Sequence, residues 1–139
     1  MNVIDKSYET ILSGQRLQEA CHSAAVNSGW WTDLSTGLDT RWVGGIPNTG
    51  MFNVPEKLML IVSEVAEAME GHRKHLQDDK LPHRSMLEAE LADAVIRCFD
   101  LAGGCGFDLG LTIVEKLAYN AQRADHKLAN RKLVGGKKF

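Results

Sequence analysis

The sequence has few of the features that mark secreted, membrane-bound or disulfide-stapled proteins. Its three cysteines are an odd number with no CxxC spacing, so they fit neither a disulfide framework nor a zinc site, and we expect reduced thiols. No apolar run approaches the ~20 residues of a membrane span. The polar start lacks the basic flank and apolar stretch of a signal peptide. These absences predict a cytoplasmic protein with no membrane partner.

Basic charge is also scarce over most of the chain. Residues 1–126 carry 11 basic against 18 acidic side chains, whereas residues 127–139 carry five Lys or Arg and no acid. An acidic body repels the backbone of a nucleic acid, so we expect no nucleic-acid polymer as a partner.

The rest of the composition is that of an ordinary globular protein. The 139 residues are 44% hydrophobic and 24% charged, which suits one domain with its own core. Apolar residues recur at helical spacing and strand-like alternation is hard to find, so we predict an all-α single domain over residues 1–139. Short connections between helices favour antiparallel neighbours and therefore a four-helix-bundle-like fold. The helices are expected at about 13–27, 53–74, 84–102 and 107–128.

Several local signals set these boundaries. The pattern also allows a weaker helical turn before the first helix. The first helix should stop at Ser28-Gly29, and the third should stop at Gly103-Gly104. Asn53 is the expected N-cap of the second helix. Residues 32–52 contain four glycines and no sustained periodicity, which predicts a loop of about 20 residues. Such a loop is either a mobile connection or a segment that faces a substrate.

Two pairs of acids stand out because each pair has i,i+3 spacing. Glu64 and Glu67 fall on the second expected helix, and Glu90 and Asp93 on the third. At ~100° per residue, each pair projects from one side of its helix, so two packed helices can direct four carboxylates to one point. Converging acids repel one another unless a divalent cation neutralises them, and Mg²⁺, with Mn²⁺ as a possible substitute, prefers oxygen ligands.

Solvated surface acids are the simpler interpretation of either pair alone. Two features favour the metal site. Nearly every neighbour of Glu64 and Glu67 is apolar. On the third helix a polar strip occupies an arc of roughly 80° on an otherwise apolar helix; it consists of Glu90, Asp93, Arg97 and Asp100.

The last expected helix carries the opposite charge. Four polar residues follow spacings of 4, 3 and 4 and are predicted to lie along one face: Lys116, Asn120, Arg123 and Lys127. Such a row alone is most often solvated. Together with a metal held by four acids, it predicts a site for a polyphosphate.

Other catalytic sites are disfavoured by missing motifs. A di-iron carboxylate bundle needs Glu-x-x-His on two helices, and the sequence does not contain two such motifs. It also has no Walker-type glycine loop and no GxSxG. Activation of water by a metal remains as the hydrolytic option.

The ordered motifs resemble those of the MazG-like all-α nucleoside triphosphate pyrophosphohydrolases, which are related to dimeric dUTPases. The signature of that family is ExxE, a spacer, ExxD, and then a helix with KxxxN. Here the acidic motifs are Glu64-Val-Ala-Glu67 and Glu90-Leu-Ala-Asp93, separated by residues 68–89, and the third motif runs from Lys116 to Asn120. The similarity covers about residues 53–127.

The resemblance implies Mg²⁺-dependent cleavage between the α and β phosphates of a (deoxy)nucleoside triphosphate, which gives the monophosphate and pyrophosphate. It implies that the four acids hold metal and that one glutamate takes a proton from the attacking water. Phosphate or sugar would be bound by Lys116, Asn120 and Arg123, with Lys127 beside them. Family members form homodimers or homotetramers. Ser63 stands where many relatives have a further acid, so the number of metal ions is left open.

The N-terminal third lies outside these motifs, although it should contact the base. Trp30, Trp31 and Trp42 could stack on a base, with Trp31 as the leading candidate, or they could pack in the core. His22 could face the site or the solvent. The basic tail, residues 128–139, could fold over the triphosphate or fray. Two alternative functions remain: a non-catalytic nucleotide- or metal-binding regulatory bundle, and an enzyme that acts on another pyrophosphate such as phosphoribosyl-ATP.

Overall fold

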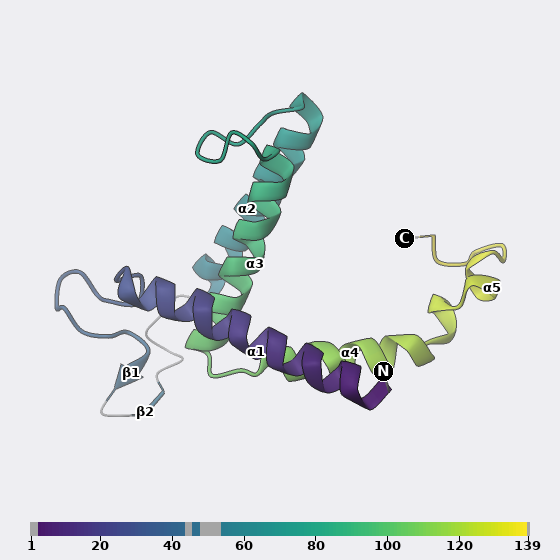
Figure 1. Ribbon diagram of the computed structural model, residues 1–139, viewed down its shortest axis with the longest axis horizontal. Helices are drawn as coiled ribbons and strands as arrows, with labels where there is room; N and C mark the ends of the chain where they lie inside the picture. The colour runs from purple at the N-terminus through teal and green to yellow at the C-terminus, as the bar shows by residue number, and fades with distance from the viewer. Residues whose placement is uncertain (1–2, 44–45, 48–53, 139) are drawn as a thin grey trace. The chain divides into compact units, whose positions relative to one another are not determined.

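The computed structural model describes residues 3–43, 46–47 and 54–138 (Figure 1). Helices dominate this part of the chain, which confirms the all-α prediction at that level. They are α1 (Val3–Asn27), α2 (Val54–Lys74), α3 (Met86–Gly104), α4 (Leu109–Gln122), the 3-10 helix η1 (Ala124–His126) and α5 (Leu128–Arg131). Among these helices, none has the length and the apolar content that crossing a membrane requires.

The chain forms two compact units. One comprises Met1–Gln15 together with Asp108–Phe139, and the other is the continuous segment Arg16–Phe107. The four acids of the predicted metal site belong to the second unit, whereas Lys116 and Asn120 belong to the first.

The second unit is built on α2 and α3, which lie side by side as the predicted helical pair (Figure 1). Their close contact depends on Gly71, because a Cβ atom there would lie 2.7 Å from Cβ of Met86. The start of α3 is capped by Ser85, whose side chain accepts a hydrogen bond of 3.2 Å from the backbone N–H of Glu88. Asn53, the expected cap of α2, lies outside the described residues.

The core of this unit is small and centres on Trp31 and Leu101. Side chains from α1, α2 and the end of α3 pack against these two residues: Ala25, Val26, Val54, Ile61 and Cys105. The second half of α1 is therefore held against the α2/α3 pair. As predicted, α1 ends before Gly29, whose positive φ of 81° is a conformation that glycine adopts without strain.

The segment after α1 is more ordered than the sequence suggested. Thr32 and Asp39 form an isolated β-bridge, and β1 (Trp42–Val43) pairs antiparallel with β2 (Ile46–Pro47). Oδ1 of Asp33 accepts hydrogen bonds from the backbone N–H groups of Ser35 and Thr36. Periodicity does not reveal such short local structures, because side chain to backbone bonds stabilise them one turn at a time.

In the first unit, α1 begins earlier than predicted. It is continuous from Val3, whereas the sequence suggested a start near Ser13. Gly14 would ordinarily weaken a helix at this point. Here it allows α4 to approach, because a Cβ atom on Gly14 would lie 2.6 Å from the Cα of Gly110. The helix therefore continues through a residue that, in isolation, looks like a stop signal.

The prediction of one last helix to about Leu128 was wrong. α4 ends at Gln122, and Arg123 has an extended backbone with φ −65° and ψ 127°. The guanidinium of Arg123 binds Asp125, with Nε 3.0 Å from Oδ1, and a separate turn follows. Further on, Arg131 donates from Nη2 to the carbonyl of Lys138 at 2.9 Å, so the described part of the basic tail folds back on itself.

Candidate metal centre and adjoining cavity

Three carboxylates converge between α2 and α3. They belong to Glu64 on α2 and to Glu90 and Asp93 on α3, and one oxygen of each lies within 4.8 Å of the others. Glu64 and Glu90 are 6% and 8% exposed, respectively, whereas Asp93 is exposed. Two buried acids thus form the base of the cluster, and the third forms its open edge.

The electrostatics of Glu90 show how closely these charges approach. Its pKa is raised to about 7, chiefly by burial and then by a hydrogen bond with Glu64 and by the negative charges of Glu67, Glu64 and Asp93. Glu67 is therefore near enough for its charge to act on Glu90, although it does not join the tight group of three. The predicted set of four acids lies in one region, with Glu67 and Asp93 on its exposed side.

Arg97 already compensates one of these charges. Its Nε donates to Oε1 of Glu64 at 2.5 Å, which links α3 to α2 directly. The single positive charge of Arg97 does not neutralise three converging carboxylates and a fourth nearby, so the cluster keeps excess negative charge. Buried oxygen ligands with excess negative charge suit a divalent cation such as Mg²⁺ or Mn²⁺, so the residues present fit the expected metal.

A cavity of ≈ 350 Å³ adjoins the acids within the same unit. Asp93 lines this cavity as well as belonging to the acid cluster. Ala24, Leu60 and Ile96 give it apolar walls. Its charged lining comprises Lys57 and Arg97 as cations and Asp93 and Asp100 as acids. The cavity therefore combines apolar walls with charged groups, of which Asp93 also belongs to the acid cluster.

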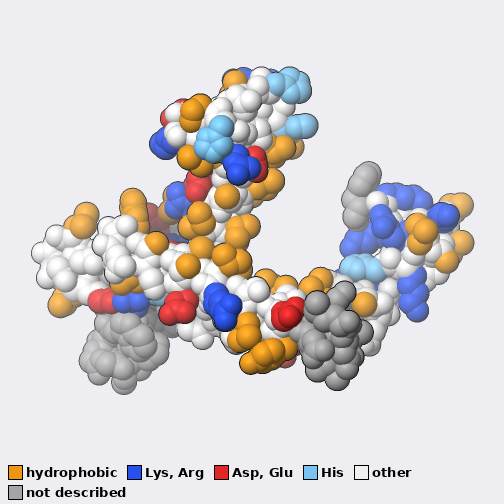
Figure 2. All heavy atoms as spheres, viewed as in Figure 1, with side chains coloured by type: hydrophobic (Ala, Val, Ile, Leu, Met, Phe, Trp, Pro, Cys, Tyr) orange, Lys and Arg blue, Asp and Glu red, His pale blue; other side chains and the backbone are white. Residues whose placement is uncertain are grey.

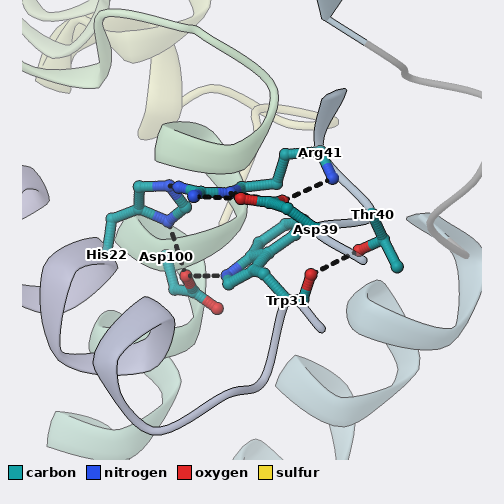
Figure 3. Close-up of polar contacts among 6 residues, drawn as sticks. All are labelled: His22, Trp31, Asp39, Thr40, Arg41 and Asp100. Atoms are coloured by element: carbon teal, nitrogen blue, oxygen red, sulfur yellow. Dashed lines mark hydrogen bonds and ion pairs between the residues drawn. The ribbon is translucent and has the colours of Figure 1, made fainter. Parts of the chain in front are cut away.

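A network of hydrogen bonds holds Asp100 at this cavity (Figure 3). Oδ1 of Asp100 lies 2.8 Å from Nδ1 of His22 and accepts a hydrogen bond of 2.7 Å from Nε1 of Trp31. On the other side of the imidazole, Nη1 of Arg41 lies 2.9 Å from Nε2 of His22. A guanidinium only donates, so Nε2 accepts and Nδ1 carries the proton that is donated to Asp100.

The same network fixes Arg41 itself. Nε of Arg41 donates to both carboxylate oxygens of Asp39, at 3.0 and 3.1 Å. This bond lowers the pKa of Asp39 and raises the pKa of Arg41. The chain of contacts thus runs from an ion pair in the loop after α1 to the Asp100 carboxylate on α3.

The tryptophans have different positions. Trp31 is 1% exposed and belongs to the core, and the ammonium of Lys57 lies 3.8 Å from its ring centroid. Burial lowers the pKa of Lys57. Trp30 is 75% exposed and lines the cavity. The side chain of Trp42 lies outside the described residues.

The row of basic residues does not lie on one helix. Lys116 and Asn120 remain on α4, one turn apart, but Arg123 is the C-cap and Lys127 lies between η1 and α5. The guanidinium of Arg123 is bound to Asp125. The predicted common face of four residues was therefore wrong, because the helix ends before its third member.

Comparison with known proteins gives no family assignment. No protein-family model, curated protein or solved structure matches this chain. The chemistry assigned to the site therefore rests on its own residues.

Sequence reasoning found the acids but missed most of the residues around the cavity. Asp100 and Arg97 were visible as members of the polar strip on α3, although no role was attached to them. His22, which the sequence left open between the site and the solvent, has a side chain only 17% exposed and contacts Asp100. Lys57 and Arg41 had no sequence signal, because their contacts form only in the folded chain.

Proposed function

We propose that this protein is a Mg²⁺-dependent nucleoside triphosphate pyrophosphohydrolase that cleaves between the α and β phosphates. The products are a nucleoside monophosphate and pyrophosphate. The observation that carries the proposal is the convergence of Glu64, Glu90 and Asp93, two of them buried, beside a cavity that also contains cations. Such a group of acids is favourable in a folded chain mainly when a cation offsets their charge.

The residues of this site have separable roles in the proposal. Glu64, Glu67, Glu90 and Asp93 would hold Mg²⁺ or Mn²⁺, which when bound supplies a Lewis acid and a water of lowered pKa. A glutamate on the exposed side, Glu67, accepts a proton from the attacking water. Arg97 and Lys57 line the cavity and can balance negative charge on a phosphate chain.

Lys116 and Asn120 keep their proposed role as ligands of phosphate or sugar, as the resemblance to the MazG-like group implies. Arg123 and Lys127 are secondary candidates, since Arg123 is engaged with Asp125. Trp31 would act indirectly, by supporting Asp100 and Lys57 from the core.

We also propose that the protein is a homo-oligomer, a dimer or a tetramer, whose α2 and α3 helices pack against a second copy. Figure 2 shows hydrophobic side chains along this pair of helices. Exposed apolar residues include Leu58, Val62, Val65 and Met69 on α2 and Leu91 and Val95 on α3. A contiguous apolar face of this kind is typical of an interface. Pairing two such faces would make a four-helix bundle.

The free thiols are compatible with the proposed cytoplasmic location.

Product analysis tests the proposed reaction. The wild-type protein is incubated with a panel of ribo- and deoxyribonucleoside triphosphates, with Mg²⁺ or with chelator, and pyrophosphate is separated from orthophosphate. We expect pyrophosphate only with the metal. Glu67→Gln and Asp93→Asn should abolish the release of pyrophosphate. The control Glu70→Gln should not, because Glu70 is an acid of α2 that pairs with Arg73 outside the site. Release of orthophosphate, or full activity of either site variant, would contradict the proposal.

A further inference from the structure

The cavity beside the acids continues along one face of α3. Asp93 and Asp100 both line it, and they are seven positions apart, which is a rise of roughly 10 Å along a helix. That span is comparable with the length of a nucleoside monophosphate from its phosphate to the far edge of its base. A phosphate near Asp93 would therefore place a base near Asp100.

The walls of the cavity suit a flat aromatic ring. Ala24 on α1, Leu60 on α2 and Ile96 on α3 supply apolar surface, and the exposed Trp30 adds an aromatic face. A volume of ≈ 350 Å³ is large enough for a small ligand such as a nucleobase with its sugar. Shape and apolar surface alone do not distinguish one base from another, so the polar groups that line the cavity decide the selectivity.

Asp100 is the one of these groups whose orientation is fixed by the hydrogen-bond network of Figure 3. Both hydrogen bonds that it receives, from His22 and Trp31, fall on Oδ1. Arg41 holds the tautomer of His22, and the Asp39 ion pair holds Arg41. In the part of the chain that the structure describes, the acceptor capacity of Oδ2 is left for a ligand. Four residues thus position one carboxylate that only accepts.

We propose that this cavity binds the base of the substrate and that Asp100 selects bases with an exocyclic amino group, cytosine over uracil and adenine over hypoxanthine. The inference rests on the proposed function, which supplies the nucleotide. In each pair the two bases have nearly the same size, and an amino donor is replaced by a carbonyl acceptor. The proposal places Oδ2 opposite this exocyclic position, where a carboxylate accepts from the amino group and repels the carbonyl oxygen, and a buried polar mismatch there gives strong discrimination.

Binding of nonhydrolysable analogues tests this selectivity without requiring turnover. Calorimetric titration with Mn²⁺ present compares the α,β-imido analogues of dCTP and dUTP, and then those of dATP and dITP. We expect the amino-bearing analogue to bind at least about tenfold more tightly in each pair. Equal affinities, tighter binding of the carbonyl analogue, or no binding of any analogue would overturn the proposal.

Two variants assign the selectivity to this cavity. Asp100→Asn should bring the cytosine to uracil ratio to within about twofold of one, because an amide both donates and accepts. Since Asp100 also supports Trp31, Ala24→Phe is a second variant that fills the cavity from the exposed surface of α1. It should weaken binding of the dCTP analogue at least about tenfold and leave Mn²⁺ affinity unchanged.

The matched control is Ser23→Phe, which adds the same ring at an exposed neighbouring position that does not line the cavity. Unaltered analogue binding by Ala24→Phe would overturn the proposal. Pyrophosphate release, measured separately, reports on the reaction itself. Release without selectivity between bases would contradict only the role of Asp100, whereas selective binding without release would contradict only the proposed reaction.

Discussion

Arg97 reaches across from α3 and donates a hydrogen bond of 2.5 Å from its Nε to Oε1 of Glu64 on α2. Glu64 is buried and is one of three converging carboxylates, so a cation of the chain already occupies part of the proposed metal site. Arg97 also lines the neighbouring cavity. A metal ion at this site would therefore compete with Arg97 for Glu64.

Arg97→Gln should tighten metal binding and destabilise the metal-free protein. The substitution removes a positive charge that competes with the metal for Glu64, and it leaves a buried carboxylate without its partner. We expect Mn²⁺ affinity to increase about three- to tenfold, and the melting temperature in chelator to fall. Arg84→Gln is the control, because Arg84 pairs with the exposed Glu88 at the start of the same helix. Weaker Mn²⁺ binding by Arg97→Gln would contradict this relationship.

Glu90→Gln should have opposite effects with and without metal. In chelator at pH 8 it removes a buried carboxylate that its neighbours repel, so the free energy of unfolding should rise by roughly 1–3 kcal/mol. The increase in melting temperature that Mn²⁺ produces in the wild type should disappear, because a ligand is lost. Thermal melts with and without Mn²⁺ check both effects, with Glu88→Gln as the exposed control. A variant that Mn²⁺ stabilises as strongly as the wild type would exclude Glu90 as a ligand.

The metal-free protein should lose stability as the pH rises toward 8. The pKa of Glu90 is raised to about 7 in the folded chain, above the ~4.3 of an unfolded glutamate. Stabilisation from its protonated form is complete below pH ~4.3 and is lost as the pH rises through about 7. Urea unfolding in chelator at pH 5 to 8 should show this decline in the wild type and less of it in Glu90→Gln. Parallel pH profiles for the two proteins would count against it.

Val62→Asp should convert the oligomer to monomers. Val62 is exposed on α2, within the apolar face assigned to the second copy, where a buried charge would be costly. Light scattering coupled to size-exclusion chromatography should show a drop from the dimeric or tetrameric mass to 15.3 kDa. Leu34→Asp is the control, because Leu34 is 96% exposed in the loop after α1. A wild type that is already monomeric at micromolar concentration would contradict the interface.

Gly14→Ala should destabilise the unit that contains α4. A methyl group there would lie 2.6 Å from the Cα of Gly110, so the two backbones would have to separate. Loss of this packing should cost roughly 1–3 kcal/mol, despite the higher helix propensity of alanine. Hydrogen exchange should be faster in α4 of the variant than in α4 of the wild type, with less change in α2 and α3. An unchanged exchange rate in α4 would show that this approach is not needed.

Much of the fold was predictable because helical periodicity is a local property. α2 and α3 lie within two residues of their predicted bounds, and the i,i+3 spacing of the acids correctly placed three carboxylates together. The end of α4 was missed, since the extended backbone of Arg123 depends on its bond to Asp125. The continuation of α1 through Gly14 was missed for a related reason, because its contact with Gly110 joins residues far apart in the sequence.

The support around the cavity was not predictable at all. Asp100, His22, Trp31 and Arg41 come from three separate segments, and their hydrogen bonds exist only after α1 and the following loop pack on α3. No spacing rule connects them. The polar strip on α3 marked Asp100 as unusual, but the partner that orients it could be identified only in the folded chain.

Mass analysis of the products formed in ¹⁸O-labelled water tests the central claim most directly. Wild-type protein is allowed to hydrolyse dCTP in ¹⁸O-labelled water with Mg²⁺, and the products are analysed by mass spectrometry. The account predicts that dCMP and pyrophosphate form only with the metal, and that each turnover places one ¹⁸O atom from water in one of these two products. Orthophosphate and dCDP as products, or the same yield in chelator, would contradict a metal-dependent cleavage between the α and β phosphates.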